Sequence, residues 1–363
     1  MSIDTEALLQ ALQTVVDPNT GKDFVSTKAL KQLQIEGGDV SFEVELGYPA
    51  RSQHAALRQQ LVAAARRVPG VANVSVQIVT RIVAHAVQRG VPLLPQVRNL
   101  IAVASGKGGV GKSTTAVNLA LALAAEGASV GLLDADIYGP SQPMMMGIEG
   151  RPESLDGQTM EPLVNYGVQV MSIGFLVDKH EAMIWRGPMA TQALEQLLRQ
   201  TNWKDLDYLV VDMPPGTGDI QLTLAQRVPI TGAVIVTTPQ DIALLDARKG
   251  VTMFQKVGVP ILGIVENMAV HVCPHCGHAE HIFGADGGKR MAAELGVPCL
   301  GSLPLHVRIR EQADGGRPTV VAEPDSELAA QYKAVARQVA LAVAAQAKDY
   351  SSKFPAIKIS QGT

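Results

Sequence analysis

The chain has 363 residues, of which 47% are hydrophobic and 18% are charged, and its formal net charge at pH 7 is −3. At roughly 150 residues per domain, this length predicts two or three domains. The small net charge gives no indication of nucleic acid or an anionic membrane as a partner. Three cysteines cannot form a disulfide framework in a chain of this length, so we expect a reducing, cytoplasmic environment.

Neither a signal peptide nor a membrane-spanning segment is expected. Residues 1–6 are acidic and lack the basic and apolar regions of a signal peptide. The longest apolar stretch, residues 116–133, is interrupted by Glu126 and Gly127, whereas a membrane span needs about 20 apolar residues. We therefore expect no membrane as a partner.

The first 90 residues have the pattern of a small α+β domain. Apolar residues recur with helical spacing over residues 5–16 and 53–67, and they alternate with polar residues, as in strands, over residues 40–46 and 71–79. Two prolines then predict a linker over residues 91–98.

The pattern of apolar residues changes at residue 99. Short apolar runs alternate with helical stretches, and the runs are continuous, as expected of strands buried on both faces. This alternation predicts an α/β domain over residues 99–348 with a doubly wound, mostly parallel sheet, a last helix over residues 325–347, and a flexible tail over residues 349–363. The predicted strands are residues 101–104, 130–133, 168–173, 208–211, 233–236, 261–265 and 300–303.

A phosphate-binding loop follows the first of these strands. Residues 106–113 read Gly-Lys-Gly-Gly-Val-Gly-Lys-Ser, which fits the pattern Gly, four residues, Gly-Lys-Ser/Thr between a strand and a helix. The backbone N–H groups of such a loop surround a polyphosphate at the N-terminus of the helix. We expect Lys112 to reach the β/γ-phosphates of ATP and the Ser113 hydroxyl to bind Mg²⁺. The loop residues expected to bind the nucleotide are Gly106, Lys107, Gly108, Gly109, Val110, Gly111, Lys112, Ser113 and Thr114.

A second lysine at the start of the loop, Lys107, indicates which class of P-loop protein the loop resembles. The run from Lys107 to Thr114 resembles the "deviant" Walker A loop of the class that includes MinD, ParA and the nitrogenase iron protein. The resemblance implies that Lys107 reaches the nucleotide of a partner subunit. Such a lysine supplies a cation in trans to the charge on the transferring phosphoryl group, as an arginine finger does.

Other polar residues follow later predicted strands, and the carboxyl ends of parallel strands meet at one edge of a sheet. Asp134 and Asp136 follow the second predicted strand, Asp212 follows the fourth, and Asn267 follows the sixth. The resemblance implies that Asp136 orients the attacking water, that Asp212 holds Mg²⁺ through water, and that Asn267 recognises adenine. Residues 213–219 have the character of a switch loop that moves with the γ-phosphate.

Cys273 and Cys276 form a Cys-Pro-x-Cys-Gly turn that can hold one metal centre. The pair supplies half a site, because structural Zn²⁺ sites and iron–sulfur clusters usually take four protein ligands. Cys299, at the start of an apolar strand, is expected to be a buried small residue. From the residues alone three interpretations stay open: an iron–sulfur cluster bridging two subunits, a zinc ion completed by His278 or His281, and a redox dithiol.

Several motifs together resemble the Mrp/ApbC family of iron–sulfur cluster carrier proteins, over about residues 97–345. The resemblance implies an ATP-binding homodimer that receives a cluster, [4Fe-4S] in type, from a donor scaffold. Cys273 and Cys276 of both subunits would hold it and pass it to apo iron–sulfur proteins, with slow ATP hydrolysis as a switch. Besides the deviant loop, the motifs are Asp-Ala-Asp-Ile-Tyr-Gly-Pro-Ser (134–141), Met-Pro-Pro-Gly-Thr-Gly-Asp (213–219), Thr-Thr-Pro-Gln-Asp (237–241), Glu-Asn-Met (266–268) and Cys-Pro-His-Cys (273–276).

Residues 1–90 resemble the small domain fused to bacterial members of this family, and Asp17-Pro18 matches its Asp-Pro element. Some such domains carry a reactive cysteine after the second strand. This chain has Pro-Ala-Arg-Ser at 49–52 and no cysteine in the domain, so a docking role remains open but a thiol-based metal role is not expected. Two alternatives for the whole chain are a ParA/MinD-type positioning ATPase and a zinc-stabilised ATPase without a cluster role.

Overall fold

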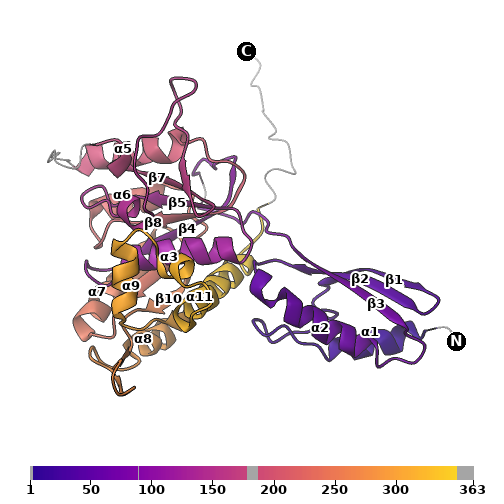
Figure 1. The fold of residues 1–363 in the computed structure, drawn as a ribbon. Coiled ribbons are helices and arrows are strands. Elements are labelled where there is room, and N and C mark those ends of the chain that lie inside the picture. Colours follow the sequence, from indigo (N-terminus) through magenta and orange to yellow (C-terminus); the bar gives the residue numbers. More distant parts are fainter. Residues whose placement is uncertain (1–2, 89, 178–186, 350–363) are drawn as a thin grey trace, which may run out of the picture.

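The computed structural model describes residues 3–88, 90–177 and 187–349. The predicted tail, residues 349–363, lies outside the described residues except for its first residue. Figure 1 shows two units: a small one built from the N-terminal part of the chain, and a larger α/β unit at its side.

The small unit is a three-stranded sheet covered by two helices. The antiparallel pair β1–β2 is extended by β3, which lies parallel to β2. Helix α2 packs on β3, and α1 packs on α2, so that the leucines of both helices fill one core. The predicted α+β unit is thus confirmed. Its elements are α1 (Thr5–Gln13), β1 (Leu30–Glu36), β2 (Asp39–Leu46), the 3₁₀ helix η1 (Arg51–Gln53), α2 (His54–Ala65) and β3 (Asn73–Thr80).

Strand β1 is an element that the sequence analysis did not predict. Its pairing with β2 shifts register between Lys31 and Gln34, and Gln32 has a left-handed φ of 51°. The shift breaks the strict alternation of apolar and polar residues by which a strand is recognised in a sequence.

The larger unit is built on an eight-stranded sheet with the order β13-β10-β9-β4-β8-β5-β7-β6. The pairs are parallel apart from the antiparallel edge pair β6–β7, which confirms the doubly wound, mostly parallel sheet. Every residue of β5 and β9 is buried, as their continuous apolar sequences require. The strands are β4 (Val97–Ala104), β5 (Val130–Asp134), β6 (Leu163–Asn165), β7 (Val168–Ser172), β8 (Leu206–Asp212), β9 (Gly232–Thr237), β10 (Ile261–Glu266) and β13 (Cys299–Ser302).

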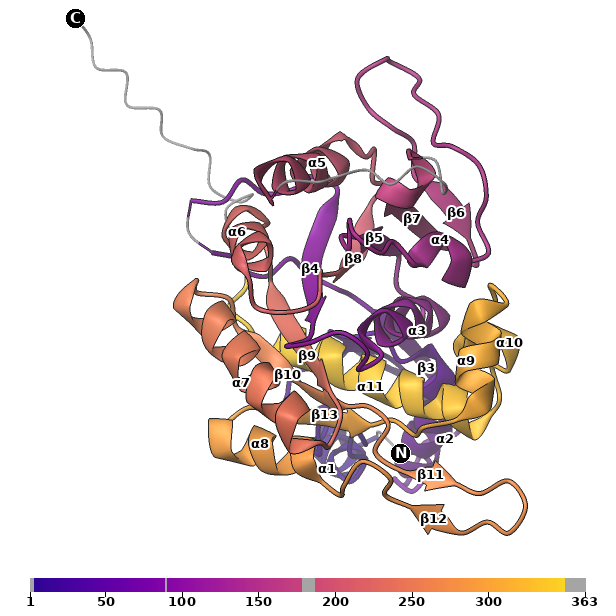
Figure 2. The same ribbon diagram turned by 90° about the vertical axis from the view of Figure 1, so that its left-hand side faces the viewer.

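Helices cover both faces of this sheet. Figure 2 shows α3 and α11 on one side and α6, α7 and α8 on the other. Alanines at many positions of α3 let it pack closely between the sheet and α11. The helices are α3 (Lys112–Ala125), α4 (Gln142–Met145), α5 (Gly187–Gln200), α6 (Asp219–Arg227), α7 (Asp241–Lys256), α8 (Gly287–Leu295), α9 (Val307–Asp314), α10 (Thr319–Ala322) and α11 (Glu327–Ala344), with a short 3₁₀ helix η2 (Ile173–Phe175) after β7.

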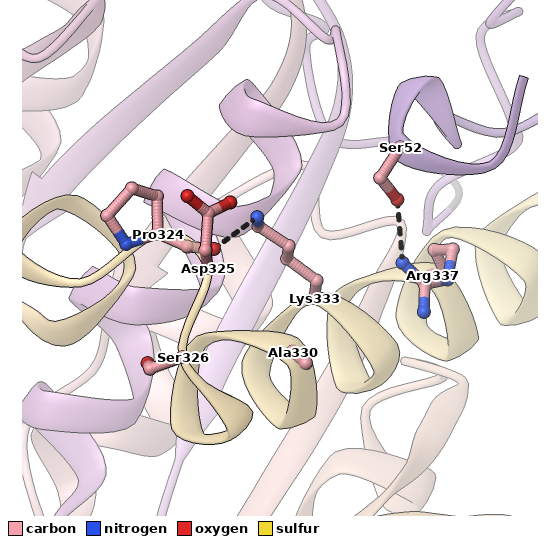
Figure 3. A pocket seen from close by; sticks show the side chains of 7 residues that line it. All are labelled: Ser52, Pro324, Asp325, Ser326, Ala330, Lys333 and Arg337. Atoms are coloured by element: carbon pink, nitrogen blue, oxygen red, sulfur yellow. Dashed lines mark hydrogen bonds between the residues drawn. The ribbon is translucent and has the colours of Figure 1, made fainter. Parts of the chain in front are cut away.

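A buried glutamate joins the two units. Glu126 follows the last residue of α3 and is 1% exposed. Its carboxylate accepts hydrogen bonds from the Ser52 hydroxyl (2.6 Å) and the Ser52 backbone N–H (3.0 Å), and from the Arg337 guanidinium of α11 (2.7 Å). Figure 3 shows the Arg337 guanidinium beside the Ser52 hydroxyl, to which it donates a hydrogen bond of 3.4 Å, at the pocket that both residues line. The small unit therefore contacts the far end of the helix that begins at the predicted phosphate loop.

The chain between the two units also contacts the larger one. His85 is 3% exposed, and its backbone N–H donates to the Asn99 side-chain oxygen at 3.2 Å. The Gln88 amide donates to the Ala225 carbonyl at 2.8 Å. Strand β4 begins at Val97, so the last two residues of the predicted linker belong to the sheet.

Candidate functional site

The predicted phosphate loop connects β4, in the middle of the sheet, to α3. Gly109 and Gly111 have φ angles of 81° and 83°, in the left-handed region that favours glycine. Gly106 lies so close to α7 that an added Cβ would be 2.1 Å from the backbone carbon of Asp246. These positions need glycine because the loop turns sharply and lies directly against its neighbours.

Lys112 is paired with the acid at the end of the neighbouring strand β8. Its Nζ donates to Asp212 Oδ1 at 2.5 Å and to the Ser113 hydroxyl at 3.0 Å, and it lies 3.9 Å from Asp136 Oδ2. The side chain of Lys112 is 6% exposed and that of Asp212 is 0% exposed. The structure thus brings these four predicted residues together at the carboxyl ends of the neighbouring strands β4, β5 and β8.

Asp134 and Asp212 are direct neighbours in the parallel pairing of β5 with β8. Burial, and after it the negative charge of Asp212, raises the pKa of Asp134 from 3.8 to about 7. Burial also raises the pKa of Asp136, which follows the same strand. Asp134 Oδ2 accepts hydrogen bonds from the Ser172 hydroxyl (3.1 Å) and from the backbone N–H of Gln142 (3.0 Å). Asp134 therefore supports the site by fixing these two neighbouring residues.

Gln142 belongs to this site, although the sequence analysis did not name it. Its Nε2 donates to Asp212 Oδ2 at 2.8 Å and to the Ser113 carbonyl at 3.1 Å. The signal available in the sequence was its position, directly after the Asp-Ala-Asp-Ile-Tyr-Gly-Pro-Ser motif.

The oxygen atoms gathered here suit a magnesium ion. Mg²⁺ prefers oxygen ligands and keeps several of its waters. The Ser113 hydroxyl and the carboxylates of Asp136 and Asp212 are such ligands, and the side chain of Gln142, which contacts Asp212 and Ser113, has a buried Oε1 without a hydrogen-bond partner. The donor set therefore fits the hydrated ion that accompanies a nucleotide.

Lys107 differs from Lys112 in its surroundings. It is half-exposed, and its carbonyl accepts a hydrogen bond from the Ser105 hydroxyl at 2.8 Å. Among the interactions of the described residues, no hydrogen bond or ion pair involves the Lys107 ammonium group. This ammonium group is therefore available to another chain, as the predicted role in trans requires.

Asn267 lies against the phosphate loop. Its side-chain N–H donates to the Val110 carbonyl at 2.9 Å, and its Nδ2 fills the space beside Gly111. Its backbone N–H donates to the Thr237 carbonyl at 2.7 Å. In the structure, the Asn267 side-chain amide supports the phosphate loop. Recognition of adenine by Asn267 stays a prediction.

The Cys-Pro-His-Cys turn lies at the tip of a hairpin formed by β11 (His271–Val272) and β12 (Ala279–Glu280). Backbone bonds close the turn: Cys273 N–H donates to the His278 carbonyl, and Gly277 N–H donates to the Cys273 carbonyl, both at 2.9 Å. Cys276 is exposed and Cys273 is partly exposed. Hydrogen bonds from the backbone N–H groups of Cys276 and then His275 lower the pKa of the Cys273 thiol, which favours the metal-binding thiolate.

A zinc site within one chain is not supported. In the part of the chain that the structure describes, no three His, Cys, Asp or Glu side chains are grouped as potential ligands of one metal ion. His281, one of the two histidines considered, directs its Nδ1 to the Ala269 carbonyl at 2.7 Å. Among the described residues, Cys273 and Cys276 therefore offer two potential metal ligands that no third such side chain joins.

The prediction that Cys299 is buried is wrong. Cys299 is exposed at the first position of β13, which forms one edge of the sheet. The apolar run that follows it is a strand as predicted, but the edge position leaves its first side chain uncovered.

Comparison with known proteins agrees with these observations. The family model described as "NUBPL iron-transfer P-loop NTPase" matches residues 96–340, and the model described as "Iron-sulfur cluster assembly protein" matches residues 5–76. The chain belongs to the NUBPL iron-transfer P-loop NTPase family. This membership makes it a nucleotide-binding P-loop NTPase of the ParA type, as the loop geometry indicates.

Relatives within the NUBPL family span most of the chain. The "Iron-sulfur cluster carrier protein" of Escherichia coli (strain K12) is 52% identical over 324 residues, which cover 89% of this chain and 88% of that protein. The protein of the same description from Pseudomonas fragi is 62% identical over 269 residues, which cover 74% of this chain and 94% of the relative. The mouse "Iron-sulfur cluster transfer protein NUBPL" is 57% identical over 256 residues, which cover 69% and 80% of the two chains.

Solved structures agree on the fold of the larger unit. A nucleotide-binding protein from Archaeoglobus fulgidus in complex with ADP has a TM-score of 0.57 and 37% identity, and the match covers 64% of this chain and 91% of that one. The cell division ATPase MinD of Pyrococcus furiosus has a TM-score of 0.51 at 22% identity, and the match covers 66% of this chain and 98% of that one, which supports the fold alone. Among the described residues of this NUBPL-family chain, no helix is long and apolar enough to cross a membrane.

Proposed function

We propose that this chain is an ATP-dependent carrier of iron–sulfur clusters, which binds a [4Fe-4S] cluster between two copies of itself and transfers it to apoproteins. The observation that carries the proposal is the Cys273–Cys276 pair on its hairpin, with Cys276 exposed and Cys273 partly exposed. One chain offers two thiolates, and a cubane takes four, so a two-fold dimer completes the ligand set. The names of the relatives support the same cargo.

The nucleotide site supplies the switch in this proposal. Lys112 and the loop N–H groups hold the phosphates of ATP, and Ser113 with Asp212 holds Mg²⁺, whose charge stabilises the transferring phosphoryl group. Asp136 orients the attacking water, and Lys107 reaches the nucleotide of the partner subunit. We expect slow turnover, because the role of hydrolysis here is to time cluster loading or release.

Two features connect the switch to the cargo. Strands β4 and β10 point the same way in the sheet, so the phosphate loop and the segment leading to the cysteine hairpin leave from the same edge. Asn267, which contacts the loop at Val110, precedes that hairpin by only a few residues. The proposed partners are a cluster donor scaffold and apo iron–sulfur proteins, and exposed thiols suit a reducing cytoplasm.

Anaerobic reconstitution with iron and sulfide tests the proposal. We expect brown protein with about four iron atoms per two chains, in a dimer by analytical ultracentrifugation, that activates an apo-enzyme requiring a [4Fe-4S] cluster. Colourless protein with tightly bound zinc, or a brown monomer with full iron content, would contradict it. A protein that takes up no cluster but binds DNA or lipid vesicles would instead favour a positioning ATPase.

A further inference from the structure

Gln142 has an unusual position for a residue outside the phosphate loop. It is 0% exposed and touches three parts of the nucleotide site at once. Its backbone N–H donates to Asp134, and its side-chain Nε2 donates both to Asp212 Oδ2 and to the carbonyl of Ser113. It therefore ties the segment after Asp136 to the two residues expected to hold Mg²⁺.

The orientation of the Gln142 amide is fixed by its partners. A carboxylate and a backbone carbonyl can only accept hydrogen bonds, so the NH₂ end must face Asp212 and Ser113. The carbonyl end, Oε1, is then left buried without a hydrogen-bond donor, as is the neighbouring Ser141 hydroxyl. A buried carbonyl without a donor is costly, and a bound water or ion is one of the groups that can supply the donor.

We propose that Gln142 is a positioning residue for magnesium: Nε2 orients Asp212 and the Ser113 backbone, and Oε1 accepts a hydrogen bond from water bound to the Mg²⁺ that arrives with the nucleotide. Mg²⁺ keeps several waters in protein sites, and each of these waters is a strong hydrogen-bond donor. The proposal rests on the nucleotide binding of the proposed function, and it is independent of the iron–sulfur cluster.

The proposal separates two effects on nucleotide affinity. In the proposed function, Lys112 and the loop N–H groups contact the phosphates directly. Among the described interactions, Gln142 contacts neither Lys112 nor a loop N–H group. Loss of the Gln142 amide should therefore leave the affinity for ADP in the absence of Mg²⁺ unchanged. It should reduce the increase in affinity for ADP that Mg²⁺ provides. A residue that merely filled space would affect both conditions equally.

The experiment measures the Kd of ADP by titration calorimetry, with Mg²⁺ and with EDTA, for the full-length wild type, Gln142→Met and Gln331→Met. Methionine keeps the length of glutamine but has no amide. Gln331, on α11, is a matched control, because its Oε1 is also buried without a partner and lies outside the nucleotide site. Gln142→Ala serves as the second variant if Gln142→Met does not fold.

For Gln142→Met we expect an unchanged Kd of ADP in EDTA. The increase in affinity that Mg²⁺ provides should be about tenfold smaller, which corresponds to one hydrogen bond to a charged group. Gln331→Met should match the wild type in both conditions. An equal loss with and without Mg²⁺, or no loss at all, overturns the proposal. A wild-type chain that binds no ADP would instead contradict the proposed function, so the two failures are distinguishable.

Discussion

Lys112 donates from Nζ to Asp212 Oδ1 at 2.5 Å, and both side chains are almost completely buried. In this arrangement the lysine of the phosphate loop is the counter-charge of the acid at the end of β8. In the proposed function, the phosphates of a bound nucleotide would compete with Asp212 for Lys112, and Mg²⁺ would take the place of the lysine beside Asp212. The ion pair would hold both side chains in position before these ligands bind.

The first prediction concerns the two lysines of the loop. Lys112→Ala should abolish ADP binding and also lower the free energy of unfolding by about 3–5 kcal/mol, because Asp212 is left buried without its partner. Adding Asp212→Ala should recover most of the stability and none of the binding. Lys107→Ala should bind ADP normally and lose ATP turnover, because the proposed function places the Lys107 ammonium group at the partner's nucleotide. Equal loss of binding in the two single variants would contradict the role in trans.

The second prediction is a dependence of stability on pH. The pKa of Asp134 is raised from 3.8 to about 7, so the folded chain keeps a proton that the unfolded chain releases in this range. The contribution of Asp134 to the free energy of unfolding should therefore fall as pH rises from 3.8 to about 7, by up to about 1.4 kcal/mol per pH unit, and level off above.

Asp134→Asn should remove the contribution of Asp134 to this slope and leave that of Asp136, since an amide does not titrate. Urea unfolding across this pH range measures the free energy of unfolding at each pH, and Asp325→Asn is the control at an exposed carboxylate. Wild-type and Asp134→Asn curves that run parallel between pH 3.8 and about 7 would show that folding does not raise the pKa of Asp134.

The third prediction concerns the cysteines. After anaerobic reconstitution, Cys273→Ala and Cys276→Ala should be colourless and should still bind ADP, because the hairpin lies outside the phosphate loop. Cys299→Ala should stay brown. Because all three thiols are at least partly exposed, Cys299 is a fair control for accessibility. Iron analysis and visible absorption give the result, and loss of colour in Cys299→Ala would show that the ligand set has been assigned wrongly.

The fourth prediction concerns the boundary between the units. A chain starting at residue 81 should fold and bind both ADP and a cluster, because it keeps the contacts of His85 and Gln88 with the larger unit. A chain starting at residue 91 should do the same with a lower melting temperature, because Asn99 loses its partner His85. Insoluble protein from both truncations would show that the two units do not fold independently.

The phosphate loop could be predicted from the sequence because its structure depends on local residues. Glycines at 106, 109 and 111 permit the turn, the short apolar run before them favours a buried strand, and the alanine-rich segment after them favours a helix. The convergence of Asp134 and Asp212 was also predictable, because each follows a strand and parallel strands end at a common edge.

Other features depend on which strands are neighbours, and only the tertiary structure decides that. Strands β8 and β5 lie side by side, and this order places Asp212 opposite Asp134 and within reach of Lys112 and Gln142. No periodicity in the sequence encodes a hydrogen bond between residues that lie 70 positions apart, as Gln142 and Asp212 do. For the same reason the exposure of Cys299 could not be predicted: a strand's own residues show that it is apolar, and its place at the edge of the sheet decides which of them is left uncovered.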